Sequence, residues 1–74
     1  MANELYKNHS LIWIALHDEQ TDSWIPQVNI SWTVSGRYKF HTFNGPVQIS
    51  HDAALALGKQ LAEDWVDKTV RSAL

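Results

Sequence analysis

The stretch QVNISWTVSGRYKFHTF, residues 27–43, alternates between apolar and polar side chains on both sides of Gly36. Successive side chains of a strand point to opposite faces of a sheet, so this alternation predicts two strands. A glycine next to a serine is typical of the tight turn that joins such strands. The stretch therefore predicts a β-hairpin with one apolar face and one polar face.

The length of the turn decides which side chains share a face of this hairpin. A loop over residues 35–37 pairs Trp32 with Phe40, whereas a loop of two residues sets Trp32 against Lys39. We expect the three-residue loop, because it keeps the large apolar side chains together on the buried face.

A further strand is predicted upstream of the hairpin. Residues 11–17 read LIWIALH, a short run rich in β-branched and aromatic residues, and the polar residues 18–23 reverse the chain after it. The next strand begins at Trp24, with Pro26 at its beginning or at a bulge, because proline donates no ladder hydrogen bond. Residues 1–9 show no period and are expected to form a flexible lead-in.

The C-terminal part of the chain has the pattern of an amphipathic helix. Ser50 precedes the pattern as an N-cap, and we expect the helix over residues 51–72. Gly58 lies in the apolar stripe, where its missing side chain favours a close approach of the helix to the sheet. The stripe comprises Ala54, Leu57, Gly58, Leu61, Ala62, Trp65, Val66 and Thr69.

Together these elements predict an α+β fold, a three-stranded antiparallel β-meander with one long C-terminal α-helix packed on one face, in the order βββα. Residues 10–74 are expected to form this single domain after the lead-in. The expected core lies between the helix and the sheet face that carries Trp24, Val28, Ile30, Trp32, Tyr38 and Phe40.

The composition predicts a small protein that is short of core. A domain of 74 residues buries only about 60% of the surface that its unfolded chain exposes, and without cysteine it has no disulfide to reinforce it. We therefore expect oligomerisation. The sequence shows neither a signal peptide nor an apolar run long enough to span a bilayer, so we expect a cytoplasmic protein without membrane contact.

The reactive side chains do not predict a catalytic, cofactor-binding or metal site. Residues 50–52 read SHD, but consecutive residues at the start of a helix point about 100° apart and do not align as a triad. The histidines His9, His17, His41 and His51 lack the spacing of a metal site. We therefore expect a protein that is not an enzyme.

The sheet face away from the helix is the candidate working surface. We expect it to collect Leu11, Trp13, Arg37, Lys39, His41 and Phe43. An apolar surface of this kind fits a protein partner, and we expect an interaction or regulatory module that acts as a homodimer. The alternative is a stacking platform for single-stranded nucleic acid, which the net charge of −2 disfavours.

The segments HTFNGP and AALALGKQLAEDWVDKTV resemble small uncharacterised bacterial proteins that end in a helix of the form A-x-x-x-G-x-x-L-A-x-x-W-[IV]-D. The resemblance covers residues 40–67. It implies a bacterial origin and a βββα domain, and it implies no activity.

Two shorter segments are similar to parts of the MbtH-like proteins, which activate adenylation enzymes and share the βββα order. DEQTDSWIP resembles their Q-x-S-x-W-P segment, and WVDKTVR resembles their W-T-D-x-R-P ending. In this chain Ile25 separates Trp24 from Pro26. The P-x-G-W segment is missing, and Val70 replaces the proline before the arginine. An activator of an adenylation enzyme is therefore a remote alternative.

Overall fold

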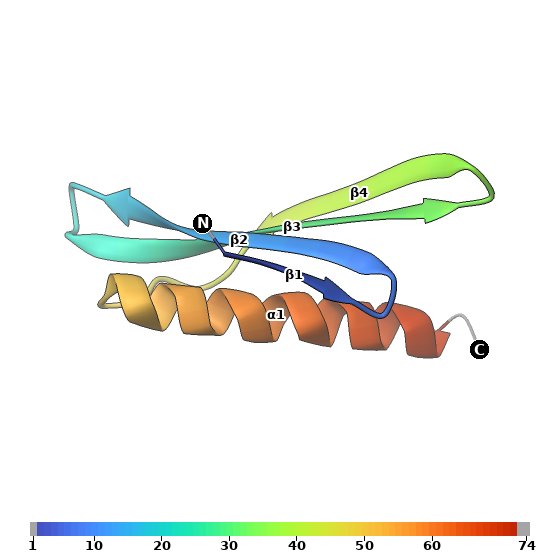
Figure 1. Ribbon diagram of the computed structural model, residues 1–74. Helices are drawn as coiled ribbons and strands as arrows, with labels where there is room; N and C mark the ends of the chain where they lie inside the picture. The colour runs from blue at the N-terminus through green and yellow to red at the C-terminus, as the bar shows by residue number, and fades with distance from the viewer. Residues whose placement is uncertain (1, 73–74) are drawn as a thin grey trace.

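The fold is a four-stranded antiparallel sheet with one helix packed along one of its faces (Figure 1). It is seen in a computed structural model, which describes residues 2–72. The strands pair in sequence order, so the sheet is a meander. Its elements are β1 (Ala2–Tyr6), β2 (His9–Asp18), β3 (Ser23–Val34), β4 (Arg37–Asn44) and α1 (His51–Ser72).

The α+β class, the antiparallel sheet and the C-terminal helix are confirmed, but the prediction of three strands is wrong. The segment predicted as a flexible lead-in forms β1, which pairs with β2 up to Tyr6 opposite His9. Lys7 and Asn8 make the turn between them, with φ angles of 48° and 65°. The order is therefore ββββα. Residues 73–74 of the predicted domain lie outside the described residues.

The helix begins where its cap predicts. The backbone N–H of Ala53 donates a hydrogen bond to Ser50 Oγ at 3.1 Å, which satisfies one of the unpaired donors of the first turn. The predicted range of residues 51–72 is confirmed. Gly58 also has the predicted role, because a Cβ atom at this position would lie 3.1 Å from Cβ of Trp13 in β2.

The prediction of a three-residue loop in the β3–β4 hairpin is wrong. Val34 lies opposite Arg37, so the loop contains only Ser35 and Gly36, and both have left-handed backbones with φ angles of 51° and 78°. Turns with two left-handed residues match the twist of paired strands, which favours them in two-residue hairpins. One residue fewer in the loop moves every side chain of β4 to the other face.

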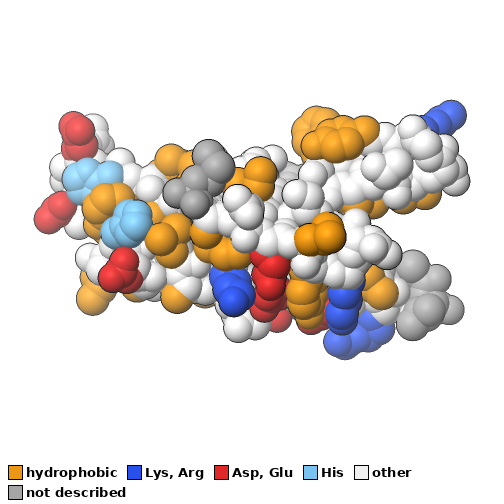
Figure 2. Space-filling view, in the orientation of Figure 1, with side chains coloured by type: hydrophobic (Ala, Val, Ile, Leu, Met, Phe, Trp, Pro, Cys, Tyr) orange, Lys and Arg blue, Asp and Glu red, His pale blue; other side chains and the backbone are white. Residues whose placement is uncertain are grey.

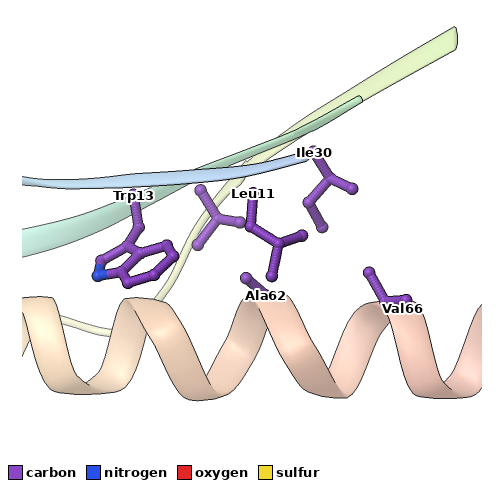
Figure 3. Close-up of a cluster of buried hydrophobic side chains, with 6 residues drawn as sticks. Leu11, Trp13, Ile30, Ala62 and Val66 are labelled. Atoms are coloured by element: carbon purple, nitrogen blue, oxygen red, sulfur yellow. The ribbon is translucent and has the colours of Figure 1, made fainter. Parts of the chain in front are cut away.

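The core differs from the predicted core in two places. Because of the β4 register, Tyr38 and Phe40 point away from the helix and are 71% and 73% exposed. The buried cluster includes Leu11 and Trp13, which were expected on the opposite face but lie beside Ile30 and Val28 in the pairing of β2 with β3. Figure 3 shows side chains from the sheet pointing toward Ala62 on α1. The buried apolar residues are Leu11, Trp13, Val28, Ile30, Ala54, Ala62 and Val66.

Pro26 lies within β3, opposite Ala15, rather than at its beginning or at a bulge. Its carbonyl accepts a hydrogen bond from the backbone N–H of Gly45 at 2.8 Å, just beyond the last residue of β4. The N–H that proline lacks would point to the same side, toward Gly45, so this pair lacks its second hydrogen bond. The loss falls just beyond the end of the β3–β4 ladder, where a proline disturbs the sheet least.

The β3–β4 hairpin rises away from α1 toward its tip (Figure 1). The molecule is accordingly elongated, with a Cα radius of gyration of 13.2 Å. A compact domain of this length has a radius of gyration of about 11 Å. One helix therefore covers one face of the sheet and leaves the other face, together with the hairpin tip, open.

Replacement of the two turn residues should change stability in opposite directions. Ser35→Asn should raise the free energy of unfolding by about 0.5 kcal/mol, because asparagine adopts the left-handed region more readily than serine. Gly36→Ala should lower it by about 1 kcal/mol. No atom lies within 4 Å of the added Cβ, so this loss reports backbone conformation alone. Urea unfolding at one fixed protein concentration measures both changes, and no change in either variant would contradict the two-residue loop.

Candidate interaction surface

The sheet face that points away from α1, here called the uncovered face, combines apolar with uncharged polar side chains and is almost free of charge. In the described strands Asp18, at the rim, is the only charged residue whose position in the ladder places it on this face. Leu5, Tyr38 and Phe40 are each more than two thirds exposed. The apolar members of the face are Leu5, Ile12, Ile14, Leu16, Ile25, Tyr38 and Phe40.

A row of polar side chains from β3 runs through the middle of the uncovered face. It comprises Gln27, Asn29, Ser31 and Thr33. Asn29 Oδ1 accepts a hydrogen bond from Thr42 Oγ1 at 2.8 Å. Two shallow grooves, of about 370 and 240 Å³, are both lined by Ser31 and Tyr38. The face therefore combines apolar walls, which favour burial, with a polar floor that can set the position of a partner.

The six residues predicted as an interaction surface do not form one surface. Leu11 and Trp13 are 0% and 6% exposed and lie under the helix, so a partner cannot reach them in this fold. The other four, Arg37, Lys39, His41 and Phe43, occupy the helix-facing positions of β4.

Sequence reasoning missed Tyr38 and Phe40 as surface residues. Each was assigned to the core through the three-residue loop, and each lies on the uncovered face because the loop has two residues. The sequence did contain the signal, since a pair of residues such as Ser35 and Gly36 between two alternating runs is typical of a two-residue hairpin loop.

His41 and Phe43 belong to an aromatic cluster between the hairpin and α1. The ring of His41 stacks on Trp65 of the helix, with centroids 4.9 Å apart and planes at 16°. Phe43 lies 5.5 Å from His41 on one side, and Trp32 lies 5.4 Å from Trp65 on the other. His9 extends the cluster to β2, with its ring 5.2 Å from Trp32. These residues hold the base of the hairpin to the helix.

Figure 2 shows acidic side chains and histidines at one end of the molecule, a basic side chain at the tip of the β3–β4 hairpin, and further charges of both signs along α1. The β2–β3 turn and the start of α1 form the acidic end, with Asp18, Glu19, Asp22 and Asp52. The other end, here called the basic end, contains the hairpin tip, the β1–β2 turn and the last turns of α1. Its basic residues are Lys7, Arg37, Lys39, Lys68 and Arg71.

Two carboxylates on α1 attach β1 to the helix and have opposite pKa shifts. Lys7 Nζ lies 2.6 Å from Asp67 Oδ1, and Tyr6 donates its hydroxyl to the same oxygen at 2.9 Å. The hydrogen bonds from Lys7 and then from Tyr6 hold the pKa of Asp67 below its usual value of 3.8. One turn earlier, the hydrogen bond with Glu4, and then burial, raise the pKa of Glu63 above 4.5. Glu4 Oε2 is buried without a hydrogen-bond partner.

Within residues 2–72 no group of three or more His, Asp or Glu side chains is arranged to hold a metal ion. No helix in the same range combines the length and the apolar character needed to cross a membrane.

Comparisons with protein-family models, with curated proteins and with solved structures gave no match to this chain. The resemblances to small bacterial βββα proteins and to MbtH-like proteins therefore stay predictions.

Replacement of the two helix carboxylates by amides should shift stability in opposite directions. Glu63 has a raised pKa in the folded chain, so its contribution is full below pH 4.5 and is lost as the pH rises through the folded value. Glu63→Gln should therefore stabilise the fold at neutral pH, since the amide can also donate to Glu4 Oε2. Asp67 has a lowered pKa, so its contribution is present above pH 3.8 and is lost as the pH falls through the folded value. Asp67→Asn should destabilise the fold at neutral pH.

Urea unfolding of both variants and the wild type between pH 3 and pH 8 measures these differences. The advantage of Glu63→Gln should vanish at the acid end, where Glu63 is itself protonated. A Glu63→Gln variant that is less stable than the wild type at neutral pH would contradict the contact between the two glutamates.

Proposed function

We propose that this chain is a non-enzymatic protein-binding module that self-associates through its uncovered face and acts as a homodimer. The observation that carries the proposal is the exposure of Tyr38 and Phe40 on a sheet face whose strands place no lysine, arginine or glutamate there among the described residues. Exposed aromatic and aliphatic side chains that gather on one face of a small protein are typical of interaction sites.

The surface area of the chain supports the proposal. Its accessible surface is 5131 Å². A folded monomer of this mass exposes about 4,700 Å². The excess agrees with the large radius of gyration, because a chain that leaves one sheet face open cannot reach the shape of a compact monomer. Burial of that face against a second molecule would remove the excess.

The uncovered face also has the size that a stable dimer needs. The molecule is 43 Å long and 20 Å across in its next dimension. A long face of these dimensions is on the order of 800 Å², which is the area that each partner buries in an interface of standard size. Tyr38 and Phe40 on this face are of the residue types frequent in interface cores, where tyrosine is a common energetic anchor.

A nucleic-acid platform has less support. Trp13, which was to provide one of its stacking rings, is buried under α1. Arg37 and Lys39 lie on the helix-facing side of β4 and not beside the exposed aromatic rings. A sheet that stacks bases needs cations and aromatic rings on the same face, so the geometry favours a protein partner.

Introduction of a charge on the uncovered face should break the homodimer. Phe40→Asp should weaken self-association at least about tenfold, because a buried aromatic anchor is lost and a carboxylate is desolvated in its place. The matched control is Ile49→Asp, which makes a similar change at a side chain that is 94% exposed and lies outside the sheet. Sedimentation velocity over a micromolar concentration series measures both.

The control variant should associate like the wild type, and both variants should keep the wild-type circular dichroism spectrum, since neither side chain is buried in the single chain. A wild-type protein that sediments as a monomer throughout the micromolar range would contradict the homodimer.

A further inference from the structure

The charge distribution points to one orientation of the two copies, and this inference rests on the homodimer proposed above. We propose that the two copies stack with their uncovered faces together and their strands antiparallel, so that the acidic end of each copy meets the basic end of the other. The partner is thus a second copy of the same chain, related by a twofold axis that crosses the strands.

Only some of the charged side chains at the two ends interact with a partner within the chain. Asp22 pairs with His17 at 3.0 Å, and Asp18 accepts a hydrogen bond from the backbone N–H of Gln20. By contrast, Glu19, at the turn, and Arg37 and Lys39, at the hairpin tip, form no ion pair with any described residue. Opposite charges that remain unpaired at the two ends of an elongated molecule favour an antiparallel arrangement of copies.

The spacing of these charges fits a twofold axis at the centre of the sheet. Asp18 lies opposite Ser23, the first residue of β3, and Arg37 lies opposite Val34, the last. A strand of this length separates the two positions by about 36 Å. A twofold axis that crosses β3 midway, between Val28 and Asn29, exchanges the two positions and brings each hairpin tip to the level of the other copy's acidic turn. Arg37 starts from the helix-facing side of β4, so its long side chain reaches that turn around the end of the hairpin.

The same axis also matches apolar side chains. Phe40 lies opposite Ser31 in β3, close to the hairpin tip, and Ile25 lies opposite Leu16, close to the acidic turn. After rotation about the middle of β3, Ser31 of one copy lies at nearly the same height along the strands as Ile25 of the other copy, within one residue. The exposed aromatic rings of one copy therefore cover the aliphatic side chains of the other, and the charges and the apolar groups select the same operation.

The Asn29 side chains of the two copies meet near the axis and fix the register of the stack. Asn29 in β3 lies opposite Ile12 in β2, close to the middle of the uncovered face. Asn29 Oδ1 accepts from Thr42. The Nδ2 hydrogens of Asn29 are left to donate to the partner's Asn29 across the axis. A polar side chain inside an otherwise apolar contact disfavours slipped arrangements that leave it unpaired.

Two other arrangements of the copies are disfavoured, the parallel stack by charge and the pairing of strand edges by the side chains that it leaves exposed. A stack with parallel strands places each hairpin tip on its counterpart, so that Arg37 and Lys39 meet the same cations. Pairing of the free edges of β4 leaves the exposed side chains of the uncovered face in water, and lysine at a strand edge discourages such pairing.

Reversal of the charges at each end tests the orientation. The tip variant is Arg37→Glu with Lys39→Glu, and the turn variant is Glu19→Lys with Gln20→Lys. Asp18 and Asp22 are left unchanged, because both support the turn. In the antiparallel stack each variant alone sets like charges against each other and should raise the dimer dissociation constant about tenfold or more. The variant with all four changes restores opposite charges and should return the constant to within about threefold of the wild type.

The parallel stack predicts a different result, because a tip that meets its own counterpart repels it with either sign of charge. Unchanged dissociation constants for the tip and turn variants would therefore overturn the inference. Added salt should weaken the wild-type dimer in the antiparallel stack, and stronger association at high salt would also overturn it.

Distances between labels give a second readout that does not depend on binding strength. The chain contains no cysteine, so Gln20→Cys at the turn and Val34→Cys at the tip each provide one site for a spin label. In the antiparallel stack a tip label and a turn label on different copies lie close together, whereas two tip labels lie about 36 Å apart. Close tip-to-tip labels would overturn the inference in favour of the parallel stack, and the absence of any close tip-to-turn pair would overturn it in favour of β4 pairing.

These results separate the inference from the function on which it rests. A dimer that Phe40→Asp breaks, but that has unchanged affinity in the tip and turn variants, would overturn the orientation and leave the proposed function standing. A wild-type protein that stays monomeric would remove both.

Discussion

The turn at Ser35 and Gly36 is the constraint from which the arrangement of this protein follows. Its two left-handed residues set Trp32 opposite Lys39, so that the odd-numbered residues of β4 share the helix-facing side with the even-numbered residues of β3. Because side chains alternate along a strand, this choice sends Tyr38 and Phe40 to the other side. A loop with one more residue would have turned both rings toward the helix side of the sheet and His41 away from it.

The second constraint is that the described chain has one helix for a sheet with two faces. The helix is long enough, at about 33 Å, to cover most of one face, and its apolar stripe packs on β2 and β3. Small residues in that stripe bring it close, since Gly58 leaves room for Trp13 and Ala62 is completely buried. The other face has no such cover, and its apolar side chains therefore remain available to another molecule.

Much of the fold follows from the sequence, because strong local signals agree with the tertiary structure. The cap at Ser50, the helix of residues 51–72 and the alternation along β3 each depend on neighbouring residues only. The features that sequence reasoning missed depend on weak or distant signals. β1 is short and partly polar, and it is held by contacts of Tyr6 and Lys7 with Asp67, which is distant in the sequence. The register of β4 depended on one residue of loop length. That residue decided that Tyr38 and Phe40, rather than His41 and Phe43, lie on the uncovered face.

The location of the charges reconciles an apolar sheet face with a specific interaction. A charge in the middle of the uncovered face would have to be desolvated whenever the face is buried, and the strands place none there among the described residues. Charges at the ends remain largely in water in every arrangement of two copies, so each attractive pair adds only modestly to affinity, whereas like charges set against each other weaken it. What they change is the relative free energy of the alternatives, because reversal of one copy converts attraction at both ends into repulsion at both ends. The apolar face would thus supply the driving force for association, and the acidic turn and the basic hairpin tip would decide its direction.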